Sequence, residues 1–198
     1  YGVYGGIKAC AQEKYGSDSV KGMTVAVQGT GHVGYYVCKY LAEEGASLVV
    51  TDIDDARVQR IVKEFGARSV GPDQIYAVDA PIFAPCALGA VVNDDTLPQF
   101  RFEIIAGAAN NVLAQERHGD QLHKRSILYA PDYVINAGGL INVYGELNDW
   151  SMDQARRKAG ENYETLGQIF SYAKENDIPT YEAADRVAER RIEQVAAL

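Results

Sequence analysis

Short apolar runs alternate with amphipathic stretches along the chain, a pattern typical of parallel strands joined by helices. The first apolar run, residues 25–27, is followed by a helical pattern from Val33 to Glu44. A second run, Leu48 to Asp52, ends in an acid, and a second helix is expected from about Asp54 to Phe65, with Asp54 as its cap. The apolar positions of the first helix recur three and four residues apart and share one face: Val33, Val37, Cys38 and Leu41.

Later apolar runs extend this alternation, separated by turns and short helices. One short helix is expected from about residue 93 and another from Arg117 to Lys124. The repeated order of strand and helix predicts an α/β fold of the Rossmann type, with a doubly wound, mostly parallel sheet. The later strands are expected at residues 67–70, 82–84, 103–106 and 127–129.

Helical patterns without intervening strands stand at both ends of the chain. Residues 1–15 predict a lead-in helix, and the start at Tyr1 rather than at a Met indicates a sequence that begins within a longer protein. Residues 151–198 predict C-terminal helices, which either cover the sheet or reach back to a second domain or subunit. We expect a single domain over residues 1–198. The two C-terminal helices are expected at Ser151 to Glu175 and, after a break at Pro179, at Tyr181 to Ala197.

The composition narrows the class of partner. The net charge of −8 argues against nucleic acid, because phosphate binding by side chains needs clustered Lys and Arg. No apolar run approaches the roughly 18 residues of a membrane span. The three histidines form no metal-type cluster, so we expect no metal site. The three cysteines have no paired spacing, which predicts reduced thiols in a cytoplasmic protein: Cys10, Cys38 and Cys86.

Three glycines directly follow the first strand in the spacing Gly-x-Gly-x-x-Gly. In a dinucleotide-binding turn, Gly29 would allow the tight turn, Gly31 would let a pyrophosphate approach the backbone, and Gly34 would let the helix pack closely on the strand. Asp52 lies 18 residues after Gly34, where a carboxylate would bind the adenosine ribose hydroxyls and repel a 2′-phosphate. No Arg follows it directly, so the pattern favours NAD over NADP. The alternatives are glycines that serve turn geometry alone, and a methyltransferase.

Small residues follow two further strands. Residues 107–111, Gly-Ala-Ala-Asn-Asn, would allow close approach of a ring and offer it amide hydrogen bonds, although tight packing would also explain them. A Gly pair at residues 138–139 would let another element or a ligand come close.

The chain offers no evident general base for a dehydrogenase. The lysines stand in helical contexts, except Lys21, which precedes the first strand at the wrong end of the sheet. No Tyr-x-x-x-Lys pair occurs at a suitable place. We therefore expect the base to belong to another domain.

Five motifs in one order resemble the leucine, phenylalanine and valine dehydrogenases, an amino-acid dehydrogenase family that includes glutamate dehydrogenase. The resemblance covers essentially the whole chain and implies its NAD-binding half. The motifs are Val-Gln-Gly-x-Gly-x-Val at 27–33, Phe-Ala-Pro-Cys-Ala-Leu-Gly at 83–89, Ala-Gly-Ala-Ala-Asn-Asn at 106–111, Tyr-Ala-Pro-Asp-Tyr at 129–133 and Asn-Ala-Gly-Gly at 136–139.

The resemblance implies oxidation of an L-amino acid by hydride transfer to NAD, followed by hydrolysis to a 2-oxo acid and ammonia. The family's catalytic lysines and aspartate lie in an N-terminal domain that has no counterpart here, so no catalytic residue is assigned. The family also implies a homo-oligomer. The residues themselves leave open a non-catalytic NAD-binding or sensing module.

The same resemblance implies roles for single residues. Asp52 would bind the adenosine ribose, Cys86 and Ala87 would lie against the adenosine and its ribose, and Ile53 would also belong to the cofactor-binding residues. The pyrophosphate would be held by the turn of Gly29, Thr30, Gly31, His32, Val33, Gly34 and Tyr35. His32 departs from the family, in which Asn is common at that position, and Gly34 stands where Ala or Gly occurs.

At the other end of the cofactor, the resemblance implies that Asn136 bonds the nicotinamide carboxamide. Leu140 and Val143 would line the substrate side-chain pocket, and their apolar character disfavours glutamate. We expect branched-chain substrates first and aromatic ones second. The nicotinamide ribose and ring would be flanked by Ala108, Ala109 and Asn110, the last also within reach of the substrate.

Overall fold

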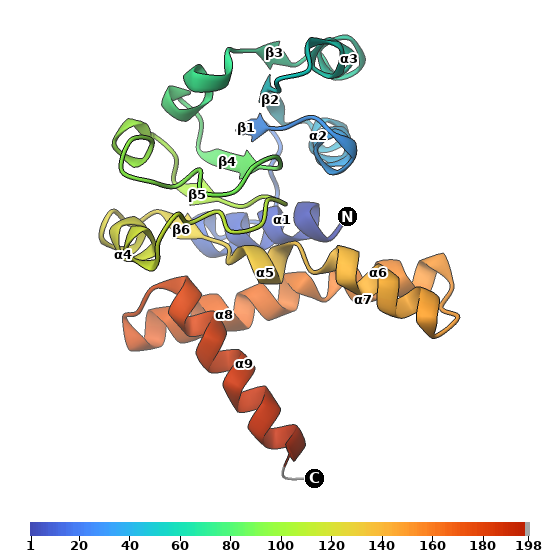
Figure 1. Ribbon diagram of the computed structural model, residues 1–198, viewed down its shortest axis with the longest axis vertical. Helices are drawn as coiled ribbons and strands as arrows, with labels where there is room; N and C mark the ends of the chain where they lie inside the picture. Colours follow the sequence, from blue (N-terminus) through green and yellow to red (C-terminus); the bar gives the residue numbers. More distant parts are fainter. Residues whose placement is uncertain (197–198) are drawn as a thin grey trace.

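A computed structural model describes residues 1–196 and contains one parallel sheet (Figure 1). Within these residues the sheet has six strands in the order β3-β2-β1-β4-β5-β6, and every pairing is parallel. The order reverses between β1 and β4, as in doubly wound dinucleotide-binding folds. The predicted fold class is confirmed. The strands are β1 Thr24–Gln28, β2 Ser47–Thr51, β3 Arg68–Ser69, β4 Ile82–Pro85, β5 Ile104–Ile105 and β6 Leu128–Tyr129.

Helices and short 3₁₀ turns connect the strands and follow them. In the sheet region these are α1 Gly2–Tyr15, α2 His32–Glu44, α3 Asp55–Phe65, η1 Pro72–Ala77, η2 Leu97–Gln99 and α4 Glu116–Lys124. After the sheet come α5 Asp132–Ile135, α6 Gly138–Leu147, α7 Met152–Gly160, α8 Asn162–Asn176 and α9 Thr180–Ala196.

Each face of the sheet has its own apolar core, because side chains alternate along a strand. Val25 and Val27 point to the side of α1, α2, α3 and α8, whereas Ala26 and Phe83 point to the side of η1, η2 and α4. On that second side the rings of Phe83 and Phe102 stack, with centroids 4.8 Å apart. The two buried clusters explain why the strand segments are apolar on both sides.

Helix α1 lies beneath the sheet against α8, although the two are far apart in sequence (Figure 1). A Cβ on Gly6 would come 2.4 Å from Ile135 and 3.1 Å from Leu166. The absence of a side chain at this position therefore allows the two helices to approach closely.

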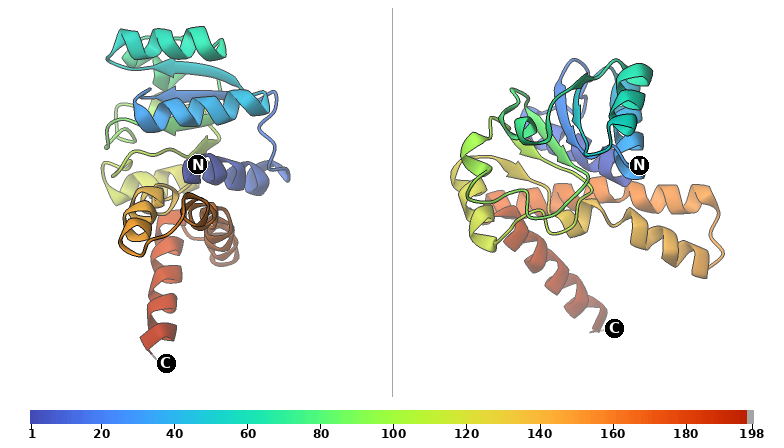
Figure 2. Two further views of the ribbon diagram at one scale, coloured as in Figure 1. Left: turned by 90° about the vertical axis from the view of Figure 1, so that its right-hand side faces the viewer. Right: turned by 45° about the horizontal axis from the view of Figure 1, so that its top comes forward.

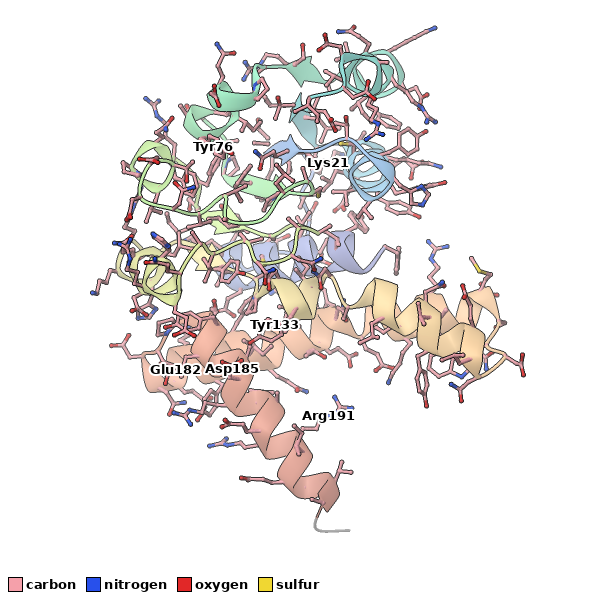
Figure 3. All side chains as sticks on the ribbon, in the orientation of Figure 1. Lys21, Tyr76, Tyr133, Glu182, Asp185 and Arg191 are labelled. Atoms are coloured by element: carbon pink, nitrogen blue, oxygen red, sulfur yellow. The ribbon has the colours of Figure 1, made fainter. Side chains whose placement is uncertain are left out.

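Figure 2 shows α6 and α7 projecting together from the body, and α9 extending away from it. Tyr133 in α5 donates from its hydroxyl to Asp185 in α9 at 2.6 Å, and this bond ties the base of α9 to the body (Figure 3). No helix within residues 1–196 is long and apolar enough to cross a membrane.

The structure corrects three predictions of secondary structure. Val33, expected on the buried face of α2, is exposed, because Gly34 takes the position against the sheet. The long helix expected from Ser151 to Glu175 is two helices, broken at Glu161 between Gly160 and Asn162, two poor helix formers. Residues 93–96 form a turn rather than a helix. Residues 138–147, for which the sequence pattern predicts no element, form the helix α6. The expected end of the last helix at Ala197 lies outside the described residues.

Candidate active site at the carboxyl edge of the sheet

The segments predicted to bind a cofactor meet at the carboxyl ends of β1, β2 and β4. Gly29 N–H donates to the Thr51 carbonyl at 2.8 Å, and Cys86 N–H donates to the Gln28 carbonyl at 2.6 Å. These bonds continue the strand pairing beyond β1 and bring the glycine turn, Asp52 and the Cys86 loop to one edge. In open α/β sheets ligands bind at this edge, next to the reversal of strand order.

The glycine turn has the geometry that a pyrophosphate requires. Gly29 has a φ of +93°, which glycine tolerates, and a Cβ there would lie 2.6 Å from Ala87. A Cβ on Gly34 would lie 1.9 Å from the Gly29 carbonyl oxygen, so an alanine there requires the turn to shift. Around Gly31, by contrast, the one atom within 4 Å of such a Cβ belongs to Arg57, and a phosphate can approach the backbone.

The amino terminus of α2 begins directly behind this turn. Thr30, Gly31 and His32 lead into the helix, so its first amides and the positive end of its dipole are directed at the space over Gly31. The turn therefore fits an anionic cofactor without a clustered set of basic side chains.

Asp52 is held at the end of β2 by three hydrogen bonds. Its carboxylate accepts from the Thr30 N–H at 2.6 Å, from the Thr30 hydroxyl at 3.1 Å and from the Asp54 N–H at 3.1 Å. Burial raises the pKa of Asp52, but these bonds and the charge of Arg57 outweigh that effect and hold it below its usual range. The group is therefore ionised at neutral pH.

Ile53 and Cys86, predicted to lie beside the adenosine, stand at this edge next to Asp52 and the glycine turn. Ile53 is almost fully exposed, so its side chain offers an apolar surface to a ring. Burial raises the pKa of the Cys86 thiol to about 11, and Cys86 therefore stays protonated and is a poor nucleophile at neutral pH. Ala87 packs against Gly29 and fixes the distance between the two loops.

The two asparagines predicted to lie near the nicotinamide are bonded to each other. Asn136, which follows α5, donates from Nδ2 to Oδ1 of Asn110 at 2.5 Å. Ala108 is partly buried beside the first apolar core, whereas the side chain of Ala109 is buried in the second. Only the backbone of Ala109 is placed near this edge, where its N–H donates to the Pro85 carbonyl at 2.9 Å.

A cleft of about 610 Å³ opens beside this amide pair, between α2, α6 and α7. Leu140 and Val143, the predicted substrate residues, do not line it and are 76% and 53% exposed on α6. Their neighbours Gly138, Gly139 and Asn142 line it instead. In a helix, positions three and four apart share a face, as Gly138, Gly139 and Asn142 do. Leu140 and Val143 lie on another face of α6, away from this cleft.

Two further residues that line the cleft, Tyr36 and Arg156, are absent from the predicted site. Tyr36 follows from the helical spacing of His32, and that periodicity could have found it. Arg156 reaches the cleft from α7, and its guanidinium lies 4.4 Å from the ring centroid of Tyr1 at the start of the chain, a contact between segments that lie far apart in the sequence. A wider groove, of about 930 Å³, lies between α8 and α9 and is remote from the carboxyl edge.

No lysine of the described chain lines the 610 Å³ cleft. Lys8, for example, is bonded to Glu44 at 2.8 Å on the far side of α2. Nor do residues 1–196 contain a group of three or more His, Cys, Asp or Glu side chains placed to hold a metal ion. The edge can bind and orient a cofactor, and the described cleft supplies no lysine base.

The strand order, the glycine turn and the anchored Asp52 define the class of Rossmann-type dinucleotide-binding domains. The comparisons identify the family within this class. A family model for the Glutamate/Leucine/Phenylalanine/Valine dehydrogenases matches residues 50–197. The chain belongs to this family.

Leucine dehydrogenase of Geobacillus stearothermophilus is 54% identical over 193 residues, which are 98% of this chain and 53% of that protein. Phenylalanine dehydrogenase of Thermoactinomyces intermedius is 42% identical over 98% of this chain and 54% of its own length. The crystal structure of L-tryptophan dehydrogenase from Nostoc punctiforme matches with a TM-score of 0.97 and 46% identity, over 100% of this chain and 59% of that one. The chain thus spans about half the length of the curated relatives it matches.

Proposed function

We propose that this chain is the cofactor-binding half of an NAD-dependent dehydrogenase that oxidises an apolar L-amino acid, leucine or another branched-chain one first, to the 2-oxo acid and ammonia. The observation that carries the proposal is the carboxylate of Asp52, fixed at the end of β2 beside an open glycine turn. The identity of 53% to 54% to leucine dehydrogenases supports the choice of substrate.

In this proposal the residues of the edge bind and orient. The amides of the glycine turn hold the pyrophosphate, and Asp52 accepts hydrogen bonds from the adenosine ribose hydroxyls. Asn136 bonds the carboxamide and so fixes which face of the ring meets the substrate. When bound, NAD supplies the hydride acceptor.

The reaction removes a hydride from Cα of the amino acid and a proton from its nitrogen, and an imino acid results. Water adds to this C=N bond, and loss of ammonia gives the 2-oxo acid. Asn110, bonded to Asn136, reaches from the cofactor side toward the substrate. The general base for the proton and water steps is proposed to lie in the other half of the protein.

An aromatic substrate is the second candidate. The 0.97 TM-score to an L-tryptophan dehydrogenase and the identity to a phenylalanine dehydrogenase favour it. We further propose that the protein is cytoplasmic, because the three cysteines of the described chain are free thiols. We also propose that it forms a homo-oligomer, as the family resemblance implies.

The test begins with this chain alone. We expect it to bind NADH in a fluorescence titration and to form no NADH from NAD with leucine, valine, isoleucine, phenylalanine, tryptophan or glutamate. Absence of NADH binding would contradict the proposal. Turnover by the chain alone would place the base among its own residues.

The substrate class is tested by joining this chain to the amino-terminal half of the Geobacillus stearothermophilus leucine dehydrogenase. We expect the chimera to oxidise leucine with a higher kcat/KM than phenylalanine or tryptophan. A chimera that binds NADH but prefers an aromatic amino acid would favour the second candidate.

A further inference from the structure

Arg57 lies over the glycine turn although it is five residues beyond Asp52. It stands in the first turn of α3, and its Nη1 atom is 3.5 Å from the position that a Cβ on Gly31 would take. Its Nε atom is 3.1 Å from Oδ2 of Asp54. The guanidinium therefore stands between the glycine turn and Asp54, the residue that caps α3.

Asp54 contacts both the backbone N–H and the guanidinium of Arg57. As the cap of α3, Asp54 accepts the backbone N–H of Arg57 through Oδ1 at 3.3 Å, and it pairs with Nε through Oδ2. A guanidinium carries five N–H donors in a fixed fork. The contact at Nε leaves the Nη donors, which make no hydrogen bond within residues 1–196 and face the open side of Gly31.

A phosphate is the ligand that this arrangement fits. The side chain is 58% exposed, so an incoming anion can reach it. The Gly31 backbone and the amino terminus of α2 lie on one side of that space and the Nη atoms on the other. Planar donor forks bind phosphate oxygens in pairs, and such charge-assisted bonds are shorter and stronger than neutral ones.

We propose that Arg57 is a cofactor-binding residue that donates to a phosphate of the adenosine half of the dinucleotide. The inference rests on the proposed function, because it adds a cation to the same site. Two phosphates share this chemistry. One is the pyrophosphate of NAD over Gly31, and the other is the 2′-phosphate of NADP beside the ribose.

The test compares Arg57→Ala with Arg60→Ala in fluorescence and calorimetric titrations of the whole chain. Arg60 lies one turn further along α3, where it pairs with Glu64 and covers the ring of Tyr35 at 4.0 Å from its centroid. Arg60→Ala is the matched control, because it removes the same charge from the same helix at a position that does not face Gly31.

The ligands are NADH, NADPH, ADP and adenosine. If Arg57 binds the pyrophosphate, Arg57→Ala lowers the affinity for NADH and ADP about 3- to 10-fold, leaves the affinity for adenosine unchanged, and makes NADH binding less dependent on salt. If Arg57 binds the 2′-phosphate, only the affinity for NADPH falls. Arg57→Lys, which keeps the charge without the fork, is expected between wild type and Arg57→Ala.

Equal affinities of wild type, Arg57→Ala and Arg60→Ala for all four ligands would overturn the inference while leaving the proposed function intact, provided that NADH binds. A loss that Arg60→Ala reproduces would also overturn it, because charge in general would then explain the effect. Failure of the wild-type chain to bind NADH would contradict both proposals. Circular dichroism of each variant shows whether the fold is retained.

Discussion

Replacing Glu44 by Gln is expected to destabilise the fold in a way that depends on pH. Glu44 is the last residue of α2, and its carboxylate accepts from the Tyr4 hydroxyl, from the Lys8 ammonium at 2.8 Å and from the Val20 N–H at 3.2 Å. These bonds join α1, α2 and the approach to β1. Only 18% of the Glu44 side chain and 20% of the Lys8 side chain are exposed.

The magnitude follows from this burial. A hydrogen bond to a charged group contributes about 1.5–3 kcal/mol, and breaking a fully buried ion pair costs about 3–5 kcal/mol. Gln keeps the shape and one acceptor but removes the charge, and the remaining exposure screens the pair. We therefore expect Glu44→Gln to lower the free energy of unfolding by about 1–3 kcal/mol at pH 7.

The sign of the pH dependence follows from the pKa shifts. Burial raises the pKa of Glu44, but the bonds from Lys8, Tyr4 and Val20 outweigh that effect and place it below its usual range. A carboxyl with a depressed folded-state pKa stabilises the fold above its unfolded pKa of about 4.3, and this contribution is lost as the pH falls through the folded value. The difference between wild type and Glu44→Gln should thus be full at pH 7 and shrink below about pH 4.

At alkaline pH the contribution of Lys8 to stability changes with pH in the opposite direction. Burial lowers the pKa of Lys8, but the bond to Glu44, together with the charge of Asp18 at 3.5 Å, outweighs that effect and raises it above its usual range. The contribution of Lys8 is therefore present below its unfolded pKa of about 10.4 and is lost as the pH rises through the folded value.

Urea unfolding followed by circular dichroism measures these differences at pH 7.5, 5 and 3.5. The matched control is Glu43→Gln, because Glu43 is exposed and pairs only loosely with Lys39, at 3.8 Å, so its change should stay under about 0.5 kcal/mol. A Glu44→Gln difference that stays constant from pH 7.5 to 3.5, or that equals the control, would refute the reasoning.

Three further changes test the site and the core. Asp52→Ala should narrow the preference for NADH over NADPH about tenfold, or about 1.4 kcal/mol, because the carboxylate that repels a 2′-phosphate is gone, and an unchanged ratio of dissociation constants would contradict this role. Asn136→Ala should weaken NADH by about 1 kcal/mol without affecting ADP, which lacks the carboxamide, whereas equal loss for both ligands would indicate damage to the whole edge. Leu166→Ala should lower the free energy of unfolding by about 2–5 kcal/mol, because Leu166 is fully buried against α1, while Leu147→Ala on the exposed face of α6 should change it little.

The sheet could be predicted from the sequence because its determinants are local. Each determinant acts over a few neighbouring residues: the apolar runs of three to five residues, the cap at Asp54 and the spacing of the glycines. The predicted cap is present, because Asp54 accepts from the N–H groups of Ala56 and Arg57. The position of Asp52 beside the turn followed from the same motif, since Gly29 and Asp52 end adjacent parallel strands.

Contacts between distant segments could not be predicted in this way. The buried amide of Asn162 donates to the Ile135 carbonyl at 3.2 Å, so the position of the start of α8 also involves a partner 27 residues away. The motif concerns the residues directly after Asp52, whereas Arg57 comes to the glycine turn from the first turn of α3. The resemblance implies a pocket role for Leu140, but the rotation of α6 about its axis, which the sequence does not determine, decides which of its residues line the cleft.

The packing of α1 on α8 also sets the order in which the chain can complete its structure. Ile7 and Cys10 on α1 are fully buried, and part of their cover comes from α8, residues 162–176. During synthesis α1 emerges more than 140 residues before α8, so the part of its apolar face that α8 covers stays exposed until nearly the whole domain has left the ribosome. The sheet contains no adjacent hairpin to close early, and such long-range pairing slows folding. The domain therefore folds late rather than progressively, and the uncovered face of α1 is the segment that most needs protection in the meantime.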